Sequence, residues 1–169
     1  GAIWTDTELT IQNSTISGNS ADDFGGGIGM WGGTVVIDNS TIAFNIADAA
    51  SGADADSGFG QGGGIDVGKQ AGAGTLTTTN SIYAGNTVFV RGVGYVANDI
   101  TLSFGTVSGT NNLVGDGATA GGLSNGINGN LVGVDPQLGV LADNGGPTLT
   151  HAIYPGSPAY NAGTASGAV

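Results

Sequence analysis

A short sequence recurs along this chain and constrains its fold more than any other feature. Asn-Ser-Thr-Ile-Ser-Gly-Asn at residues 13–19 returns as Asn-Ser-Thr-Ile-Ala-Phe-Asn at 39–45 and as Asn-Ser-Ile-Tyr-Ala-Gly-Asn at 80–86. The copies start 26 and 41 residues apart, and the second step is longer because extra residues fall in two turn-like segments, 48–58 and 69–73. Insertions confined to turns are typical of solenoids, in which one unit stacks on copies of itself.

Each repeat is expected to fold into short strands rather than helices. Apolar and polar residues alternate ahead of the repeated sequence, with Leu9 and Ile11 in the first copy and Val35 and Ile37 in the second. A period of two indicates a strand whose two faces differ. Glycine supplies 35 of the 169 residues, and glycine, Asn, Ser and Thr all disfavour helix interiors. We therefore predict an all-β chain wound into a parallel β-helix.

The repeated asparagines are predicted to form two stacked columns, which we call ladders. Coils stack about 4.8 Å apart, a distance at which identical side-chain amides hydrogen-bond up the stack. The corners between strands also require the left-handed backbone that Asn accepts. The first ladder would contain Asn13, Asn39 and Asn80, flanked by Ser14, Ser40 and Ser81, and the second would contain Asn19, Asn45 and Asn86. Asn13 and Asn39 also begin Asn-Ser-Thr glycosylation sequons, an alternative that does not explain the spacing.

The apolar member of each repeat is predicted to point into the solenoid. Ile16, Ile42 and Tyr83 hold equivalent places in the three copies and would form one vertical core column. Ile28 and Ile65 each follow a run of three glycines and would lie in another strand of the same coils. The predicted architecture requires this stacking. If residues 16, 42 and 83 lay far apart, the predicted β-helix would be wrong.

The charge balance limits the partners that the chain can bind. The chain has thirteen acidic residues and only two basic residues, Lys69 and Arg91, which gives a net charge of −11. Nucleic acid and anionic membrane surfaces are not expected as partners, since both require a basic face. The chain has no cysteine, so it offers no disulfide framework. An acidic, lysine-poor and cysteine-free composition favours an extracellular or cell-surface location.

The composition changes in the last third of the chain. All four prolines lie there, after the clean repeats have ended. We predict β-helix coils over residues 1–129 and a loop-rich capping motif over 130–169, packed on the same solenoid and covering one end. The opening residues Gly1-Ala2-Ile3 resemble the Gly-Gly-Ile step inside a coil, so the coils are expected to continue from a longer chain.

This last segment carries a specific series of short motifs. They are Asn130–Gly133, Asp135–Gly139, Leu141–Thr148, His151-Ala152, Pro155–Ala159 and Ala162-Gly163. Their order and spacing resemble the carboxyl end of the choice-of-anchor Q domain proteins, a bacterial surface family. The chain departs from that pattern at Tyr160-Asn161. The resemblance implies a right-handed parallel β-helix, export and display at the cell surface, and it implies no known catalytic residue.

Acidic residues in two turns are the candidates for binding a metal ion. Asp54 and Asp56 lie in the longer insertion, and Asp22 and Asp23 lie in the equivalent turn one coil earlier. If these turns stack, four carboxylates could converge on Ca²⁺, a hard cation that prefers oxygen ligands. The alternative is a solvated acidic loop. No other cofactor is expected.

The sequence assigns no catalytic residue. His151 could pair with Asp135 or Asp143, but no nucleophile has a recognisable context, and Asp38 and Asp66 are isolated outward candidates for hydrolysis. We therefore expect a non-catalytic extracellular structural or surface-display module that associates end to end with itself into a fibre, or with other surface proteins.

Two alternative functions remain open. One is a carbohydrate-binding adhesin, for which Trp4 and Trp31 are possible glycan contacts. They follow successive Gly-Ile units at matching places, so they could instead pack on each other. The other is a polysaccharide lyase or hydrolase, since such enzymes share the β-helix fold.

Overall fold

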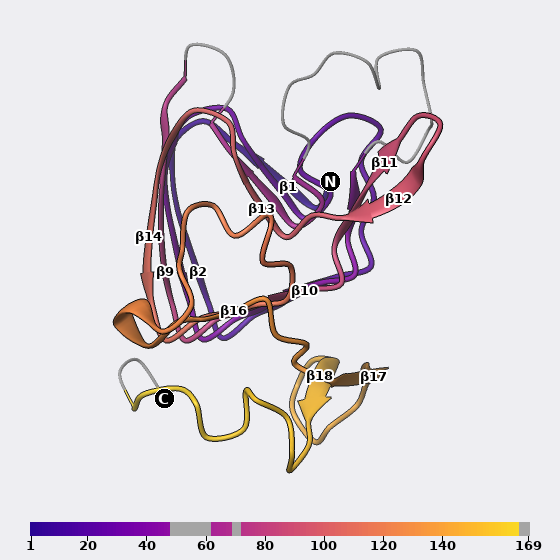
Figure 1. Ribbon diagram of the computed structural model, residues 1–169, viewed down its shortest axis with the longest axis vertical. Helices are drawn as coiled ribbons and strands as arrows, with labels where there is room; N and C mark the ends of the chain where they lie inside the picture. Colours follow the sequence, from indigo (N-terminus) through magenta and orange to yellow (C-terminus); the bar gives the residue numbers. More distant parts are fainter. Residues whose placement is uncertain (48–61, 69–71, 166–169) are drawn as a thin grey trace.

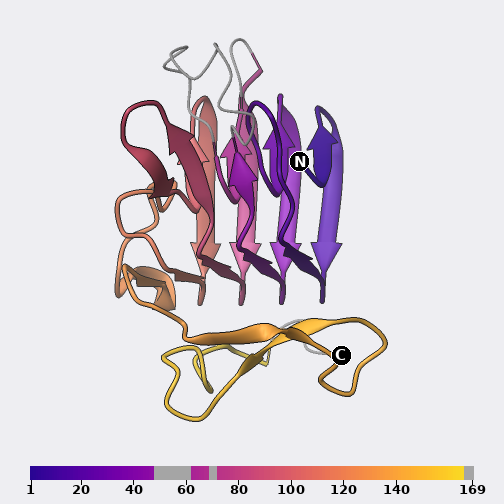
Figure 2. The same ribbon diagram turned by 90° about the vertical axis from the view of Figure 1, so that its right-hand side faces the viewer.

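The computed structural model describes residues 1–47, 62–68 and 72–165. The described chain is all β, and its strands stack into three parallel sheets, with the coils lying one behind another in the view of Figure 1. Figure 2 shows successive coils side by side as parallel columns. This arrangement, with its repeated strand spacing, is consistent with the predicted parallel β-helix.

Sheet A begins each coil. Its strands, in order along the stack, are β1 (Ile3–Thr5), β4 (Ile28–Met30), β8 (Ile65–Val67) and β13 (Ile100–Leu102). Isoleucine opens every strand, and the four isoleucines lie in one register. The predicted stacking of Ile28 on Ile65 is therefore confirmed.

Sheets B and C complete the coil. Sheet B contains β2 (Glu8–Gln12), β5 (Gly33–Asp38), β9 (Gly74–Thr79) and β14 (Gly105–Thr110). Sheet C contains β3 (Thr15–Ser17), β6 (Thr41–Ala43), β10 (Ile82–Ala84), β15 (Leu113–Val114) and β16 (Leu131–Val132). Each repeated sequence thus supplies one strand of sheet C.

The predicted core column is present in sheet C. Ile16 pairs in register with Ile42, and Ile42 pairs with Tyr83, so the three residues lie in one vertical file. The file continues through Val114 and Val132 in the next two coils. Ile42 and Tyr83 are completely buried, as the inward face of a half-buried strand requires.

Tyr83 brings a hydroxyl into this apolar column, and a small polar network receives it. The Tyr83 hydroxyl donates to Oγ1 of Thr78 at 2.9 Å, and Oγ1 of Thr78 donates to Oδ1 of Asn112 at 3.1 Å. Thr78 holds the place that Ile37 fills one coil earlier, and Gly109 holds it one coil later. The file of Ile37, Thr78 and Gly109 therefore carries smaller residues in the coils where the polar side chains of Tyr83 and Asn112 lie beside it.

The corners between sheets B and C have the predicted left-handed backbone. The φ angles of Asn13, Asn39 and Asn80 are 49°, 49° and 50°. Asn111 holds the same corner in the fourth coil with a φ of 55°, although it lies outside the recognised repeats. Asn tolerates this conformation better than other side-chain-bearing residues, which explains the recurrence of this residue at the corner.

A short fourth sheet projects from the corner between sheets C and A. It contains β7 (Ile46–Ala47), β11 (Thr87–Val90) and β12 (Gly94–Ala97), and β12 turns back antiparallel to β11. Phe89 and Tyr95 contact each other across this hairpin with ring centroids 5.3 Å apart. The hairpin is visible as the projection labelled β11 and β12 in Figure 1.

A partial fifth turn, residues 115–132, lies over the fourth coil. Thr119 accepts a main-chain hydrogen bond from Ile100, Asn128 accepts one from Asn111, and β16 pairs with β15. The short 3-10 helix η1 (Ile127–Gly129) falls in this segment, and Leu123 packs against the core. The stack therefore extends three residues past the predicted boundary at 129.

The last segment lies along the side of the stack. Its hairpin, β17 (Leu138–Ala142) and β18 (Thr150–Ile153), and the residues that follow run beneath sheet C across successive coils (Figure 2). Leu138 and Ala159 pack on outward residues of sheet C, among them Ile82 and Leu113. The predicted packing on the solenoid is present, but the prediction that this segment covers an end was wrong. Apolar side chains on the outer face of sheet C provide the surface on which it packs.

Candidate functional site

The second predicted ladder is present as continuous hydrogen bonds through the interior. Asn45 is fully buried, and its Oδ1 accepts the main-chain N–H and the Nδ2–H of Asn19, each at 3.0 Å. Its Nδ2 donates to Oδ1 of Asn86 at 2.9 Å and to the main-chain oxygen of Ile16 at 3.0 Å. Asn86 likewise donates to the main-chain oxygen of Ile42 at 2.9 Å. Both ends of these amides are thus engaged within the stack.

The predicted serine column is also present and passes into two further asparagines. The N–H of Ser14 donates to Oγ of Ser40 at 3.1 Å, and the N–H of Ser40 donates to Oγ of Ser81 at 3.2 Å. The N–H of Ser81 then donates to Oδ1 of Asn112 at 3.0 Å. Oδ1 of Asn130 accepts the N–H and the Nδ2–H of Asn112, each at 3.0 Å. The sequence repeats did not identify Asn112 or Asn130.

Asp99 takes the place of an amide at the end of the second ladder. It lies in register with Gly27 and Gly64, directly before the isoleucines of sheet A. Its buried side chain turns inward, and its Oδ1 accepts the N–H and the Nδ2–H of Asn86 at 3.2 and 2.8 Å. Its Oδ2 accepts the N–H of Asp116 at 2.8 Å. The ladder is therefore completed by a residue that precedes a strand of sheet A and does not occupy the repeated Asn position.

Burial raises the pKa of the Asp99 carboxyl above its ordinary value. The carboxyl of Asp116 raises this pKa further, whereas hydrogen bonds from Asn86 and from the N–H of Asp116 oppose the rise. The folded protein therefore binds this proton more tightly than the unfolded chain. The resulting contribution to stability is fully present at acid pH and is lost as pH rises through the folded-state pKa.

We predict that Asp99→Asn removes this pH dependence. The free energy of unfolding of both proteins would be measured by urea denaturation at pH 4 and at pH 7. The advantage of the natural protein over the variant should be larger at pH 4 than at pH 7, because only the natural protein loses the contribution of Asp99. An equal difference at the two pH values would contradict the prediction.

His151 fastens the last segment to the first coil. Its Nδ1 lies 2.7 Å from the main-chain oxygen of Gly139, and its Nε2 lies 2.7 Å from Oγ of Ser17. A carbonyl only accepts, so Nδ1 carries the proton and, in the neutral ring, the Ser17 hydroxyl donates to Nε2. The ring also contacts Phe44, with centroids 5.1 Å apart. These partners differ from the predicted aspartates and give His151 a structural position.

The two tryptophans do not lie over each other. Trp4 is in register with Gly29, so the predicted match with Trp31 was wrong. Trp31 instead contacts Phe24, with ring centroids 6.0 Å apart, and the Phe24 ring lies over Gly29. Trp4 and Trp31 are 58% and 37% exposed. We call Trp4, Phe24 and Trp31 the aromatic surface.

The candidate carboxylates are not gathered into one site in the described part of the chain. Asp22 and Asp23 are exposed, whereas Asp54 and Asp56 lie outside the described residues, so their predicted convergence on calcium is untested. No group of three or more metal-binding side chains converges among the residues that the structure describes. Asp66 lies on the predicted outward face of its strand, in register with Gly29, but it is completely buried there and accepts a hydrogen bond from Ser103 at 2.7 Å.

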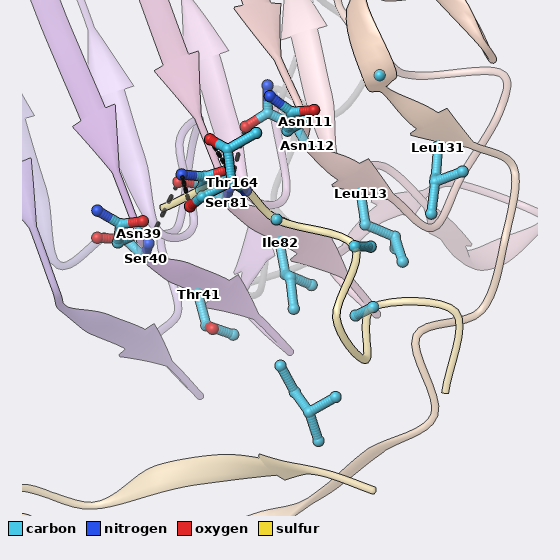
Figure 3. A pocket seen from close by; sticks show the side chains of 16 residues that line it. Asn39, Ser40, Thr41, Ser81, Ile82, Asn111, Asn112, Leu113, Leu131 and Thr164 are labelled. Carbon is cyan, nitrogen blue, oxygen red and sulfur yellow. Dashed lines mark hydrogen bonds between the residues drawn. The ribbon is translucent and has the colours of Figure 1, made fainter. Parts of the chain in front are cut away.

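A groove lies between the corners of the coils and the last segment. Its cavity volume is about 260 Å³. Asn80 fixes one wall, because its Nδ2 donates to the main-chain oxygen of Thr164 at 3.1 Å and its Oδ1 accepts the N–H of Thr164 at 2.9 Å. Asn39 and Asn111 line the groove one coil to either side (Figure 3). This groove brings together three equivalent corner amides.

Comparison with known proteins identifies no relative. No protein-family model, curated protein or solved structure matches the chain. Among the described residues, no helix is long and apolar enough to cross a membrane.

Proposed function

We propose that this chain is a non-catalytic extracellular structural module, built as a right-handed parallel β-helix of the kind that choice-of-anchor Q domain proteins display at bacterial surfaces. Right-handed crossovers between parallel strands of one sheet are strongly preferred, which supports the proposed handedness. The sequence resemblance in residues 130–163 supports the proposed location.

One observation carries the proposal, which is that the repeated polar side chains serve the stack itself. Asn45 and Asn86 are fully buried and hydrogen-bond to neighbouring coils through both ends of their amides. Ser40 and Ser81 are also buried and accept main-chain hydrogen bonds from the preceding coil. Side chains used in this way stabilise a rigid rod and leave few groups for chemistry on a substrate.

The module is further proposed to associate through the edge formed by β1, β2 and β3. These are the outermost strands of sheets A, B and C in the described part of the chain. An outermost strand presents N–H and C=O groups that can pair with another strand. Residues 115–132 cover the opposite end of the stack, which favours contact between two such edges over an unlimited fibre.

Thr10 allows a direct test of this association. Thr34 donates to the main-chain oxygen of Thr7, and Asn13 donates to that of Asp38, so alternate residues of β2 face β5. The N–H of Thr10 therefore points toward the outer edge. We expect the 169-residue chain to associate with increasing concentration in sedimentation experiments, and we expect Thr10→Pro to prevent it. Thr10→Ala keeps the N–H and is the matched control.

Three outcomes would count against the proposal. A species that stays monomeric at every concentration, or a Thr10→Pro variant that associates like the natural chain, would refute association through this edge. Release of sugars from pectin or alginate by the purified protein would refute the non-catalytic role.

A second candidate function is glycan binding at the aromatic surface. Trp4 and Trp31 expose large ring areas beside Phe24, and such rings pack against the C–H faces of sugars. Loss of glycan binding on Trp31→Ala would favour this function, and unchanged binding would exclude this surface as the site.

A further inference from the structure

The groove beside the corner asparagines carries no formal charge. Its lining consists of asparagine, serine, threonine, glycine, alanine, isoleucine and leucine residues. None of these described residues is acidic, basic or aromatic, although the chain has a net charge of −11. A charged ligand would be desolvated there without an opposite charge, so the groove favours an uncharged ligand.

The polar groups of the groove repeat along the axis of the stack. Asn39, Asn80 and Asn111 hold the same left-handed corner in successive coils, with φ angles of 49°, 50° and 55°. Each side-chain amide presents a donor and an acceptor next to each other. Asn80 shows what this pairing does, since it binds both the N–H and the C=O of Thr164. Neighbouring hydroxyls of a sugar present the same combination of donor and acceptor.

Apolar side chains provide the rest of the wall. Leu131 of sheet C is half-buried and Ile153 of the last segment is exposed, whereas Ile82 and Leu113 of sheet C are buried where the last segment packs on them (Figure 3). Aliphatic groups of this kind pack against the C–H face of a sugar ring and exclude water from its hydrogen bonds. The cavity volume of about 260 Å³ is slightly below the range for ligand pockets, about 300–1,000 Å³, so the groove suits one or two sugar units.

We propose that this groove binds a neutral saccharide, with Asn111 hydrogen-bonding to adjacent hydroxyls and the aliphatic wall packing on the ring. The site is separate from the aromatic surface and independent of the proposed structural role. An extended peptide is the other ligand that corner amides could hold, as Asn80 holds Thr164, but a peptide bound in this way would have to carry small, neutral side chains.

The test is calorimetric titration of the full 169-residue chain with maltotetraose, cellotetraose and mannotetraose. Tetragalacturonate is the charged comparison and is expected not to bind. The informative variant is Asn111→Gly, which removes the amide while glycine accepts the φ of 55°. The matched control is Asn13→Gly, at the same type of corner with a φ of 49° but outside the groove.

We expect at least one neutral tetrasaccharide to bind. Asn111→Gly should weaken its affinity by roughly 10-fold, which corresponds to the loss of one good hydrogen-bonded contact. Asn13→Gly should leave the affinity unchanged. Thermal unfolding of both variants would confirm that they fold. Failure of all three saccharides to bind, or equal affinity for Asn111→Gly and the natural chain, would overturn the proposal. Loss on Trp31→Ala instead would move the site to the aromatic surface, and selective binding of a synthetic peptide with the sequence of residues 155–165 would identify a peptide receptor. Either of these two results would also overturn it.

Discussion

Asn45→Ala is expected to lower the free energy of unfolding by about 3 kcal/mol, because the substitution leaves buried polar groups without partners. Asn45 is completely buried, and its side chain makes hydrogen bonds to Asn19, Asn86 and the main chain of Ile16. For a chain of this length the loss corresponds to a fall in Tm of about 6–12 °C. Urea denaturation and a thermal melt would measure both quantities.

Asn19→Ala is the control for this prediction. Asn19 is the outermost amide of the same ladder, only half-buried, and it donates to Asn45 without receiving a ladder hydrogen bond from a further described coil. Its removal should cost about 1 kcal/mol, the usual net value of one hydrogen bond. Equal costs for the two substitutions would mean that burial of the ladder does not determine its contribution to stability.

Gly64→Ala is expected to destabilise the protein by about 3 kcal/mol through steric overlap. A Cβ on Gly64 would lie 2.4 Å from the main-chain oxygen of Asp99 and 2.9 Å from Nδ2 of Asn86. The first neighbour is backbone and the second is fixed in the ladder, so neither can move without breaking the stack. The thermal unfolding temperature and the urea midpoint should both fall.

Gly146→Ala is the matched control for the steric prediction. The nearest atom to a Cβ at Gly146 is the main-chain oxygen of Thr148 at 3.9 Å, an ordinary contact distance. That substitution should leave stability unchanged or raise it slightly, because alanine restricts the unfolded chain. If Gly64→Ala were equally harmless, the close approach of the ladder to sheet A would be wrong.

The repeat predicted the strands of sheet C and their register well, since the same residue types recur at the same places. Ile16, Ile42 and Tyr83 form the expected file, and Asn19, Asn45 and Asn86 form the expected ladder. In these residues the local sequence and the stacked contacts agree. The amide contacts among the first-ladder asparagines remain a prediction, although their corner conformation is confirmed.

Two ladder residues were missed although the sequence contains a signal for them. Asn112-Leu113-Val114-Gly115 and Asn130-Leu131-Val132-Gly133 are the same four residues, and both place Asn in the serine column and Leu-Val in sheet C. The second copy also belongs to the motif that resembles a surface-protein family. Assigning it to that motif obscured its role as a final strand of the stack.

The groove and the position of the last segment could not be predicted from local sequence. Asn80 and Thr164 are separated by 84 residues, and no periodic pattern connects them. The same is true of Ser17 and His151, which are 134 residues apart. These contacts depend on which outer face of the stack offers apolar side chains. The alternation of residues in a strand shows which of its faces is apolar. It does not show which distant segment packs against that face.

Because Asp99 replaces an amide in the ladder, the number of residues per turn can change along the stack. Asn86 and Asp99 are separated by the β11–β12 hairpin, yet their side chains meet. Continuity of the interior is therefore maintained in space and does not require a fixed number of residues per turn. This corner can accommodate an excursion of foreign sequence, which makes it a natural position for grafting a reporter peptide onto the rod.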